Sequence, residues 1–276
     1  MNAPAGIASM PLYTHVDRIE RGLASLGIRP GDPVRPEQLF RFDQWHYHGT
    51  DAIEAAGRAL GLGPNSHVLD VGAGVGGPAR FLAHTTGCRV TALELQPHLH
   101  EVGVDLTRRS GLADRVSHVC GDALTVALAP GSFDDVISFL AVLHIADRPA
   151  LLRRWAELLR PGGRCYIEDL CRRAPFAAAD LEDLRSIVHG RTVTSMDDYA
   201  GDLRGAGFVD VAAADLTGDW APYAAERLAA WRGNREAYAL VHGEGAYAAQ
   251  ELFYAVISRL YASGSLGGLR LTARHP

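Results

Sequence analysis

Segments that read as buried strands alternate with helical segments between residues 64 and 170, and this alternation constrains the fold more than any other feature of the sequence. Strands are expected at 66–71, 88–94, 115–119, 133–140 and 163–169, with helices at 77–86, 97–110 and 148–159. The stretches 68–71 and 136–140 are nearly uninterrupted apolar runs, which is typical of central parallel strands covered on both faces. The pattern therefore predicts an α/β fold around a doubly wound sheet.

The flanking segments predict further helices around this core. Apolar residues recur at steps of three and four over 12–26, and longer helices are expected at about 221–240 and 244–262. A helix at 196–205 precedes a strand at 207–213, and a last strand is expected at 267–273. We expect an N-terminal helical lid at 1–60, a core at 61–170, and cap helices plus closing strands at 171–276. Because ligands bind beyond the carboxyl ends of such strands, the extra helices are expected to cover that edge.

A glycine-rich stretch, VLDVGAGVGGPAR at residues 68–80, follows the first strand of the core and opens a helix. Glycines at such a turn allow the backbone to approach a ligand closely. The spacing GxGxxG at Gly72, Gly74 and Gly77 is shared by nicotinamide sites and other adenosine-binding sites. The glycines alone therefore do not choose the cofactor.

The acidic residues near the glycines favour a cationic cofactor without phosphate. Asp70 lies two residues before the first glycine, where its carboxylate would repel a pyrophosphate. S-adenosylmethionine carries a sulfonium and an ammonium group and has no phosphate. Glu94 ends the second strand, where a carboxylate can accept both ribose hydroxyls, and Asp122 follows the third strand, where it can accept from an adenine amino group. Each acid could instead have a local structural role, as a strand-end cap, a solvated surface acid or a turn residue.

The order of motifs resembles the class I S-adenosylmethionine-dependent methyltransferases: VLDVGAGVGG, TALEL, GDA, FDDVISFLAVLHI and LLRPGGRCYIEDL, over about residues 68–170. The GGPAR variant is similar to a small-molecule branch that includes sarcosine/dimethylglycine, phosphoethanolamine, sterol and natural-product tailoring enzymes. This resemblance implies a Rossmann-like, seven-stranded, mostly parallel sheet whose last strand is antiparallel. It implies S-adenosylmethionine as cofactor, with Gly72 and Gly74 at its methionine part, Glu94 at the ribose, Leu95 on the adenine face and Asp122 at the adenine amine. The full set of expected cofactor-binding residues is Asp70, Gly72, Ala73, Gly74, Glu94, Leu95, Gln96, Gly121, Asp122, Ala123 and Leu140.

Two residues at expected strand ends are candidates for acid–base chemistry. His144 is expected at the end of the fourth strand and Asp169 at the end of the fifth, and the family's strand order makes these strands neighbours. A carboxylate there could orient the imidazole and raise its pKa, so that His144 acts as a base toward the acceptor. The alternative is that His144 seals the strand end and Asp169 bonds loop amides.

The segment FDQWHYHGT at residues 42–50 is rich in polar aromatic groups and precedes the core. His46 is a further catalytic candidate, and Trp45, Tyr47 and the later Trp220 are candidates for contacting the substrate, with plain packing as the alternative for each. Tyr13 resembles a lid tyrosine of this branch that orients the cofactor or acts as an acid or base. His46 and His48 lack a third ligand at a suitable spacing, so we expect no metal.

Composition excludes several classes of function. All 27 basic residues are arginine, so the chain has no Walker A lysine, no Schiff-base lysine and no Tyr/Lys hydride-transfer pair. The net charge of −5 without a basic run argues against a nucleic-acid partner, and no apolar stretch reaches the ~20 residues needed to cross a membrane. The four cysteines have no CxxC spacing and fit buried thiols in the cytoplasm. The adjacent Arg172 and Arg173 could attract an acidic substrate, although such a pair is more often simply solvated.

We therefore expect a methyltransferase that acts on a small-molecule acceptor, by transfer to oxygen or nitrogen. Carbon methylation of an isoprenoid, indole or other aromatic substrate remains an alternative, because Trp45, Tyr47 and Trp220 could steady a cation. A nicotinamide-dependent oxidoreductase and a non-catalytic binding protein on the same fold are alternatives of another class. The oligomeric state is left open between a monomer and a homodimer.

Overall fold

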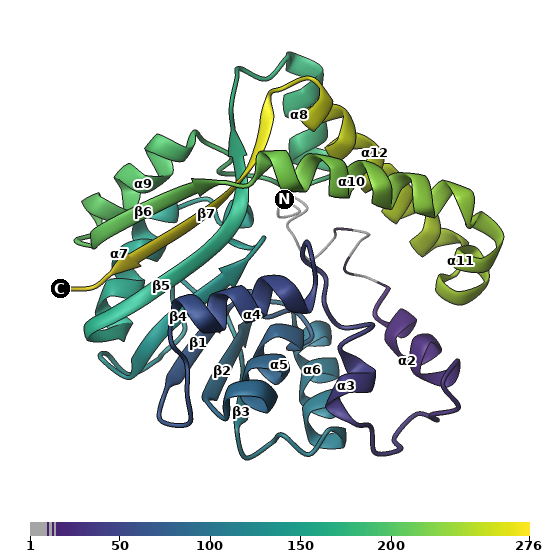
Figure 1. Ribbon diagram of the computed structural model, residues 1–276, viewed down its shortest axis with the longest axis horizontal. Helices are drawn as coiled ribbons and strands as arrows, with labels where there is room; N and C mark the ends of the chain where they lie inside the picture. The colour runs from purple at the N-terminus through teal and green to yellow at the C-terminus, as the bar shows by residue number, and fades with distance from the viewer. Residues whose placement is uncertain (1–9, 11–12, 14) are drawn as a thin grey trace, which may run out of the picture.

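The computed structural model describes residues 10, 13 and 15–276, which form a seven-stranded sheet with helices on both faces (Figure 1). The strand order is β3-β2-β1-β4-β5-β7-β6, and β7 runs antiparallel to both of its neighbours while the other pairs are parallel. The strands are β1 His67–Val71, β2 Arg89–Glu94, β3 Val116–Cys120, β4 Phe133–Phe139, β5 Leu159–Arg172, β6 Val209–Asp215 and β7 Leu266–Arg274. The predicted fold class is confirmed, including the antiparallel last strand.

Apolar residues of the central strands pack on both faces of the sheet, as their uninterrupted apolar runs predict. In β1, Val68 belongs to the apolar cluster that includes α4 and α5, while Leu69 and Val71 belong to the cluster that includes α7 and α9. The helices of the core are α4 Thr50–Ala59, α5 Gly77–Thr86, α6 Pro97–Arg109, α7 Arg148–Leu158 and α9 Met196–Gly205. The strand order reverses between β1 and β4, which is the point where ligands bind in sheets of this kind.

The remaining helices lie beside the carboxyl edge of the sheet, and in Figure 1 α10 to α12 extend from β6 and β7 toward α2. These helices are α2 Asp17–Ala24, α3 Pro36–Leu39, α8 Ala178–Ser186, α10 Thr217–Gly233, α11 Arg235–His242 and α12 Glu244–Ala262. The single helix expected at 221–240 is wrong, because the chain breaks at Asn234 between α10 and α11. Gly233 and Asn234 are poor helix formers, which explains the break.

The first predicted helix is only partly described. Its expected start at Leu12 lies outside the described residues, within which α2 begins at Asp17. None of the described helices combines the length and the apolar character needed to span a membrane.

Candidate active site

A first cavity opens where β1 to β4 end, and it contains the glycine-rich stretch. All expected cofactor-binding residues line it, namely Asp70, Gly72, Ala73, Gly74, Glu94, Leu95, Gln96, Gly121, Asp122, Ala123 and Leu140. Four strand ends thus supply one wall, as the position of the switch point in the sheet requires. The sequence analysis correctly predicted that these residues share one site, and their binding of the cofactor stays a prediction.

The glycine turn is shaped by positive backbone angles. Gly72, Gly74 and Gly76 have φ values of 77°, 55° and 79°, which are unfavourable for residues with a Cβ atom. A Cβ on Gly72 would lie 2.3 Å from the Cβ of Ala141, whereas a Cβ on Gly74 would meet nothing within 4 Å. Gly72 therefore permits close packing of β1 on the turn after β4, and the backbone at Gly74 faces open space.

Asp70 is buried at 1% exposure, and its Oδ2 atom has no hydrogen-bond partner among the described residues. Burial and the nearby Glu94 carboxylate raise the pKa of Asp70 to about 7. Glu94 is satisfied differently: it accepts hydrogen bonds from the Gly74 and Gln96 backbone amides, each at 2.9 Å. An unpartnered carboxylate in a cavity is a site prepared for a cation.

The charge of this cavity fits S-adenosylmethionine and does not fit a pyrophosphate. Among the described residues, the lining holds Asp43, Asp70, Glu94 and Asp122 and no arginine. Asp122 uses Oδ1 to accept from the Leu124 amide at 2.9 Å, so this acid also stabilises its own turn. The acidic residues around the glycines, rather than the glycines themselves, thus favour a cationic cofactor without phosphate.

Asp43 is a lining residue that the sequence did not indicate. Its carboxylate accepts from Arg80 at 2.8 Å, and both side chains are fully buried. The pair ties the segment before α4 to helix α5, which begins at the glycine turn. No local pattern signals this contact, because the two residues are far apart in the sequence.

A second cavity, of about 340 Å³, lies between the carboxyl edge of the sheet, the segment before α4, α2 and the helices α10 to α12. It is lined mainly by apolar and aromatic side chains from these elements. Five residues line both cavities: Tyr13, Trp45, His46, Leu140 and His144. The two cavities therefore meet at a common wall, where a group bound in one can reach a group bound in the other.

His144 lies in this common wall, although it does not end a strand as expected. Strand β4 stops at Phe139, Leu140 has a left-handed φ of 52°, and His144 closes a short 3-10 helix at Val142–His144. The Nδ1 atom of His144 is 3.0 Å from the His189 backbone oxygen. Since a carbonyl only accepts, Nδ1 carries the proton and Nε2 keeps a lone pair. Burial lowers the pKa of His144 to about 4, so the imidazole is neutral at pH 7.

The predicted pairing of Asp169 with His144 is wrong. Asp169 lines neither cavity; it accepts from the Leu170 amide at 2.9 Å and from the Tyr199 hydroxyl at 3.2 Å. Strand β5 continues three residues beyond Asp169 because β7 pairs with it as far as Arg172, so Asp169 lies inside the strand. Burial lowers the pKa of His144 instead of the expected rise, and among the described residues no carboxylate reaches the imidazole to oppose this.

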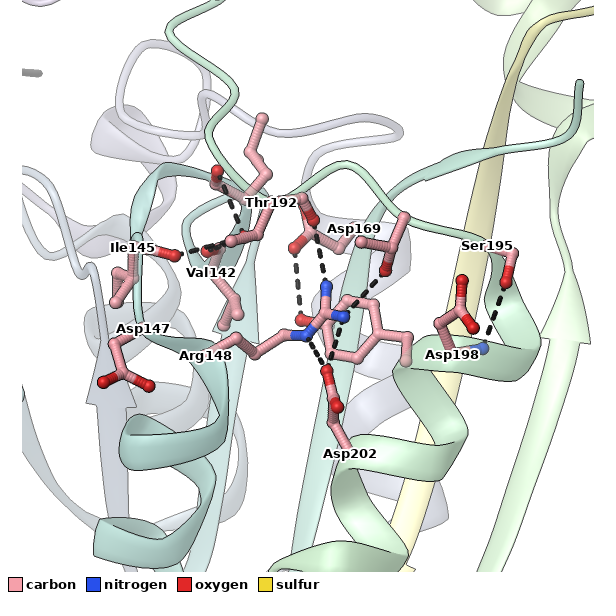
Figure 2. A network of polar contacts seen from close by, with 12 residues as sticks. Val142, Ile145, Asp147, Arg148, Asp169, Thr192, Ser195, Asp198 and Asp202 are labelled. Carbon is pink, nitrogen blue, oxygen red and sulfur yellow. Dashed lines mark hydrogen bonds and ion pairs between the residues drawn. The ribbon is translucent and has the colours of Figure 1, made fainter. Parts of the chain in front are cut away.

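Asp169 instead lies near a polar network that holds the turn carrying His144. Figure 2 shows Arg148 between Asp202 and the loop that contains Thr192. The Arg148 guanidinium donates to Asp202 at 2.6 Å and to the Thr192 backbone oxygen at 2.9 Å. The Thr192 hydroxyl in turn donates to the Ile145 backbone oxygen at 3.1 Å. The network thereby ties the part of the connection that leads into α7 to the loop at Thr192.

His46 and Tyr13 complete the polar groups of the common wall. His46 Nε2 donates to the Gly49 carbonyl at 2.9 Å, and burial lowers the His46 pKa to about 4. Burial and the Glu94 carboxylate raise the pKa of Tyr13 strongly, so its phenol stays protonated and can donate a hydrogen bond at neutral pH. The Tyr13 ring lies 6.2 Å from the Trp45 ring, nearly parallel to it, and 6.2 Å from His144.

The three aromatic candidates for substrate contact divide between cavity and core. Trp45 lines both cavities and Tyr47 lines the second, and their contact with a substrate stays a prediction. Trp220 lines neither: it is 2% exposed, packs edge-on against Tyr47 at 4.6 Å, and covers Gly268 of β7. The interpretation of Trp220 as a substrate contact is therefore wrong, and packing explains it.

Comparison with known proteins agrees with this geometry. Residues 69–167 match a family model described as a methyltransferase domain. The chain is 32% identical over 223 residues to 27-O-demethylrifamycin SV methyltransferase of Amycolatopsis mediterranei (strain S699), covering 79% of this chain and 80% of that protein. It is 36% identical over 151 residues to Methyltransferase GfsG of Streptomyces halstedii, covering 54% of each chain. The matched segments span about half the length of several such relatives, GfsG included.

The fold comparison extends over the whole chain. The crystal structure of geranyl diphosphate C-methyltransferase from Streptomyces coelicolor A3(2) matches over 100% of both chains, with a TM-score of 0.71 and 19% identity. At this identity the likeness establishes the shared fold, cap included. The sequence relatives, which are named as methyltransferases, argue against the nicotinamide-dependent alternative. The chain belongs to the S-adenosylmethionine-dependent methyltransferases.

Proposed function

We propose that the protein methylates an oxygen or nitrogen atom of a small organic acceptor that binds in the second cavity. The observation that carries this proposal is the common wall, where five residues line both cavities. A cofactor held along the strand ends and an acceptor held under the helices would meet there. The relative named 27-O-demethylrifamycin SV methyltransferase supports an oxygen acceptor.

The residues of the first cavity hold the cofactor. Asp70 would accept from the ammonium group through its unpartnered carboxylate oxygen, and Glu94 would accept from the ribose hydroxyls in place of the Gly74 amide. Bound S-adenosylmethionine supplies an electrophilic methyl group on a sulfonium. Holding the donor and the acceptor in line contributes ~7–11 kcal/mol in well-oriented reactions, so positioning is the main task of the protein.

His144 is the proposed base for an acceptor that carries a proton. Its Nδ1–H is held by the His189 carbonyl, which leaves Nε2 free to take the proton of a hydroxyl or ammonium group at the common wall. Such assistance contributes ~10²–10⁴-fold. Tyr13 is a hydrogen-bond donor beside this base, because its raised pKa keeps the phenol protonated. His46 has a similar neutral imidazole and is the second candidate for the base.

A carbon acceptor is a second candidate function, favoured by the aromatic lining of the second cavity. Trp45, Tyr47 and Trp231 lie there, and their rings could steady a cation formed during methylation of a double bond. The product distinguishes the two reactions, since a new O–CH₃ or N–CH₃ group differs from a new C–CH₃ group in its NMR shift.

The test joins a binding assay to a transfer assay. Thermal shifts with S-adenosylhomocysteine and with NAD identify the cofactor, and labelled-methyl transfer over a metabolite panel identifies the acceptor class. We expect stabilisation by S-adenosylhomocysteine only, transfer to at least one hydroxylated or aminated compound, and loss of that transfer in His144→Gln. Binding of S-adenosylhomocysteine with no transfer to any acceptor would instead support a non-catalytic protein.

A further inference from the structure

The two cavities carry opposite charges. Among the described residues, the first is lined by four acids and no arginine, whereas the second is lined by Arg18, Arg41 and Arg227 and by no aspartate or glutamate. The chain as a whole has a net charge of −5, so this concentration of arginine is not a general property of its surface. The second cavity is therefore suited to a ligand of negative charge.

Arg18 is half-buried, and it differs in its partners from three buried arginines of the described chain. Arg80, Arg109 and Arg148 each have a carboxylate partner, which is Asp43, Glu20 and Asp202, respectively. Arg18 has no carboxylate within 4.0 Å among the described residues, since the adjacent Asp17 bonds to Arg21 at 2.6 Å. The residues outside the described part, 1–9, 11, 12 and 14, include no aspartate or glutamate that could serve. Burial of a charged group without a partner is costly, so an unpaired guanidinium in a cavity indicates a binding group.

The side chain of Arg18 is held in place without being neutralised. Its guanidinium lies over the Trp45 ring at 4.0 Å and donates to the Gln250 side chain at 3.3 Å, while Nε is buried with no partner. Burial lowers the pKa of Arg18 to about 10, which still leaves it charged at neutral pH. A fixed planar guanidinium with free donors matches an oxyanion, which it can bind through two parallel hydrogen bonds.

We propose that the acceptor is an amphipathic oxyanion, a largely apolar molecule with a carboxylate or phosphate group, and that Arg18 binds this group with support from Arg41 and Arg227. The proposal rests on the proposed function, because it names the substrate class of the same second cavity. The Trp45 and Tyr13 rings lie between the guanidinium and His144. The anionic group is therefore bound at a distance from the atom that receives the methyl group.

The remaining walls suit the apolar body of such a molecule. Trp231 on α10 and Phe253 and Tyr254 on α12 line the cavity opposite the sheet. The arginine pair that the sequence offered for an acidic substrate does not take part. Arg172 pairs with Asp198 at 3.7 Å and Arg173 with Asp215 at 3.5 Å, and neither lines a cavity.

The test uses two fluorescent probes that differ by one sulfonate group, the anion 8-anilinonaphthalene-1-sulfonate and the neutral N-phenyl-1-naphthylamine. Both are titrated into the full chain with S-adenosylhomocysteine present and absent. We expect the wild type to bind the anion about tenfold or more tightly than the neutral probe, as hydrogen bonds to charged groups contribute. Arg18→Gln should remove this preference and leave the neutral probe bound as before, while Arg18→Lys should retain part of it. Competition by decanoate, decyl phosphate and decanol then identifies which anion is preferred.

Arg58→Gln is the matched control, because Arg58 is exposed, pairs with Glu54 at 2.5 Å and lines neither cavity. It should bind both probes as the wild type does. Equal binding of the two probes by the wild type, or an unchanged preference in a folded Arg18→Gln variant, would overturn the proposal. Near-UV circular dichroism shows that each variant is folded. The probes need no turnover, so failure of methyl transfer leaves this result standing, and failure here leaves the cofactor binding test unaffected.

Discussion

The Nδ1 atom of His144 lies 3.0 Å from the backbone oxygen of His189, so the tautomer of the proposed base is set by a peptide carbonyl. A carbonyl cannot become protonated and carries no full charge, unlike the carboxylate that the sequence suggested. It orients the ring but does little to stabilise an imidazolium. Burial lowers the pKa of His144 to about 4, and the hydrogen bond to the His189 carbonyl offsets this decrease only in part, so the base is weak.

The first prediction tests whether the His144 imidazole acts as the base and whether its partner is the backbone rather than the side chain of His189. His144→Gln should lower kcat by ~10²–10⁴-fold with little change in S-adenosylhomocysteine affinity, because only the proton transfer is removed. His189→Asn should keep nearly full activity, since the acceptor is a backbone atom and asparagine tolerates the positive φ of 55° at this position. Steady-state kinetics and calorimetry measure both effects. A large loss in His189→Asn would mean that the His189 side chain itself acts.

The pH profile gives a second prediction. A base with a folded-state pKa of about 4 is already unprotonated above that pH, so kcat should be level from pH 5 upward and should fall on acidification through about pH 4. An ordinary exposed histidine would give the fall near 6.5. The profile is measured with circular dichroism at each pH to separate titration from unfolding. A fall centred near 6.5 in the folded enzyme would show that His144 is more solvated than the structure indicates.

Asp70 supplies the third prediction, on cofactor affinity. Asp70→Asn removes the unpartnered charge that would meet the ammonium group, so S-adenosylmethionine affinity should fall by about tenfold or more. The matched control is Asp134→Asn, which removes an acid paired with Arg160 outside both cavities. Isothermal titration calorimetry should show unchanged affinity in this control. Equal losses in both variants would indicate a general effect of net charge.

The same residue has a consequence for stability. Because the Asp70 pKa is raised to about 7, the folded protein binds this proton more tightly than the unfolded chain does. Its contribution to stability is therefore present at low pH and is lost as the pH rises toward 7. Without ligand, Asp70→Asn should melt a few degrees above the wild type at pH 8, with the gap narrowing on acidification to pH 5. A wild type that melts higher throughout would show that Asp70 is ionised and satisfied in the free protein.

The polar network around Arg148 gives the fourth prediction. Arg148→Met leaves Asp202 without its partner, and because that carboxylate is 29% exposed, the loss of unfolding free energy should be near the lower end of the ~3–5 kcal/mol typical of buried pairs. The network holds the turn that carries His144, so kcat should fall more than KM rises. Arg154→Met on the same helix, whose partner Glu157 is exposed, should cost less than 1 kcal/mol. Urea unfolding and steady-state kinetics check both variants.

The fifth prediction compares two glycines with positive φ. Gly72→Ala combines an unfavourable φ of 77° with a contact of 2.3 Å to Ala141, so it should abolish cofactor binding and destabilise the fold. Gly61→Ala has a φ of 54° but nothing within 4 Å of the added Cβ, so it should cost only ~1–2 kcal/mol of backbone strain. Thermal melting with and without S-adenosylhomocysteine separates the two. Similar behaviour of the two variants would show that close packing of the turn is unimportant.

The sequence predicted the sheet well because apolar alternation and glycine punctuation are local signals. The five core strands begin within four residues of their expected starts, and the expected cofactor-binding residues share one cavity. The end of β5 was misplaced because its last residues depend on pairing with β7, a hundred positions later in the chain. Asp169 was misassigned for that reason. The proposed division into lid, core and cap stays a prediction.

The second cavity was not readable from local pattern. Arg18 lacks a carboxylate partner because Asp17 pairs with Arg21 and because α12 places Gln250, which is neutral, beside it. The spacing of residues in the sequence predicts neither contact. Trp220 was misassigned for a similar reason, since only the tertiary structure shows that Gly268 of β7 makes room for its ring. Residue types indicated the cofactor chemistry correctly where the ends of neighbouring parallel strands bring the residues together. Residue types did not predict the second cavity, which several helices far apart in the sequence form together.

The helices α10 to α12 leave the sheet after β6 and return to it at β7, and Asp215 at the departure pairs with Leu269 near the return. The segment 217–262 is thus a loop insertion whose two anchors are already joined by the sheet. Replacing this segment by the corresponding segment of another methyltransferase of the family would leave the first cavity, proposed for the cofactor, intact. We expect such a graft to replace the walls of the second cavity that α10 to α12 form, while Arg18 and Trp45, which lie outside this stretch, stay in place.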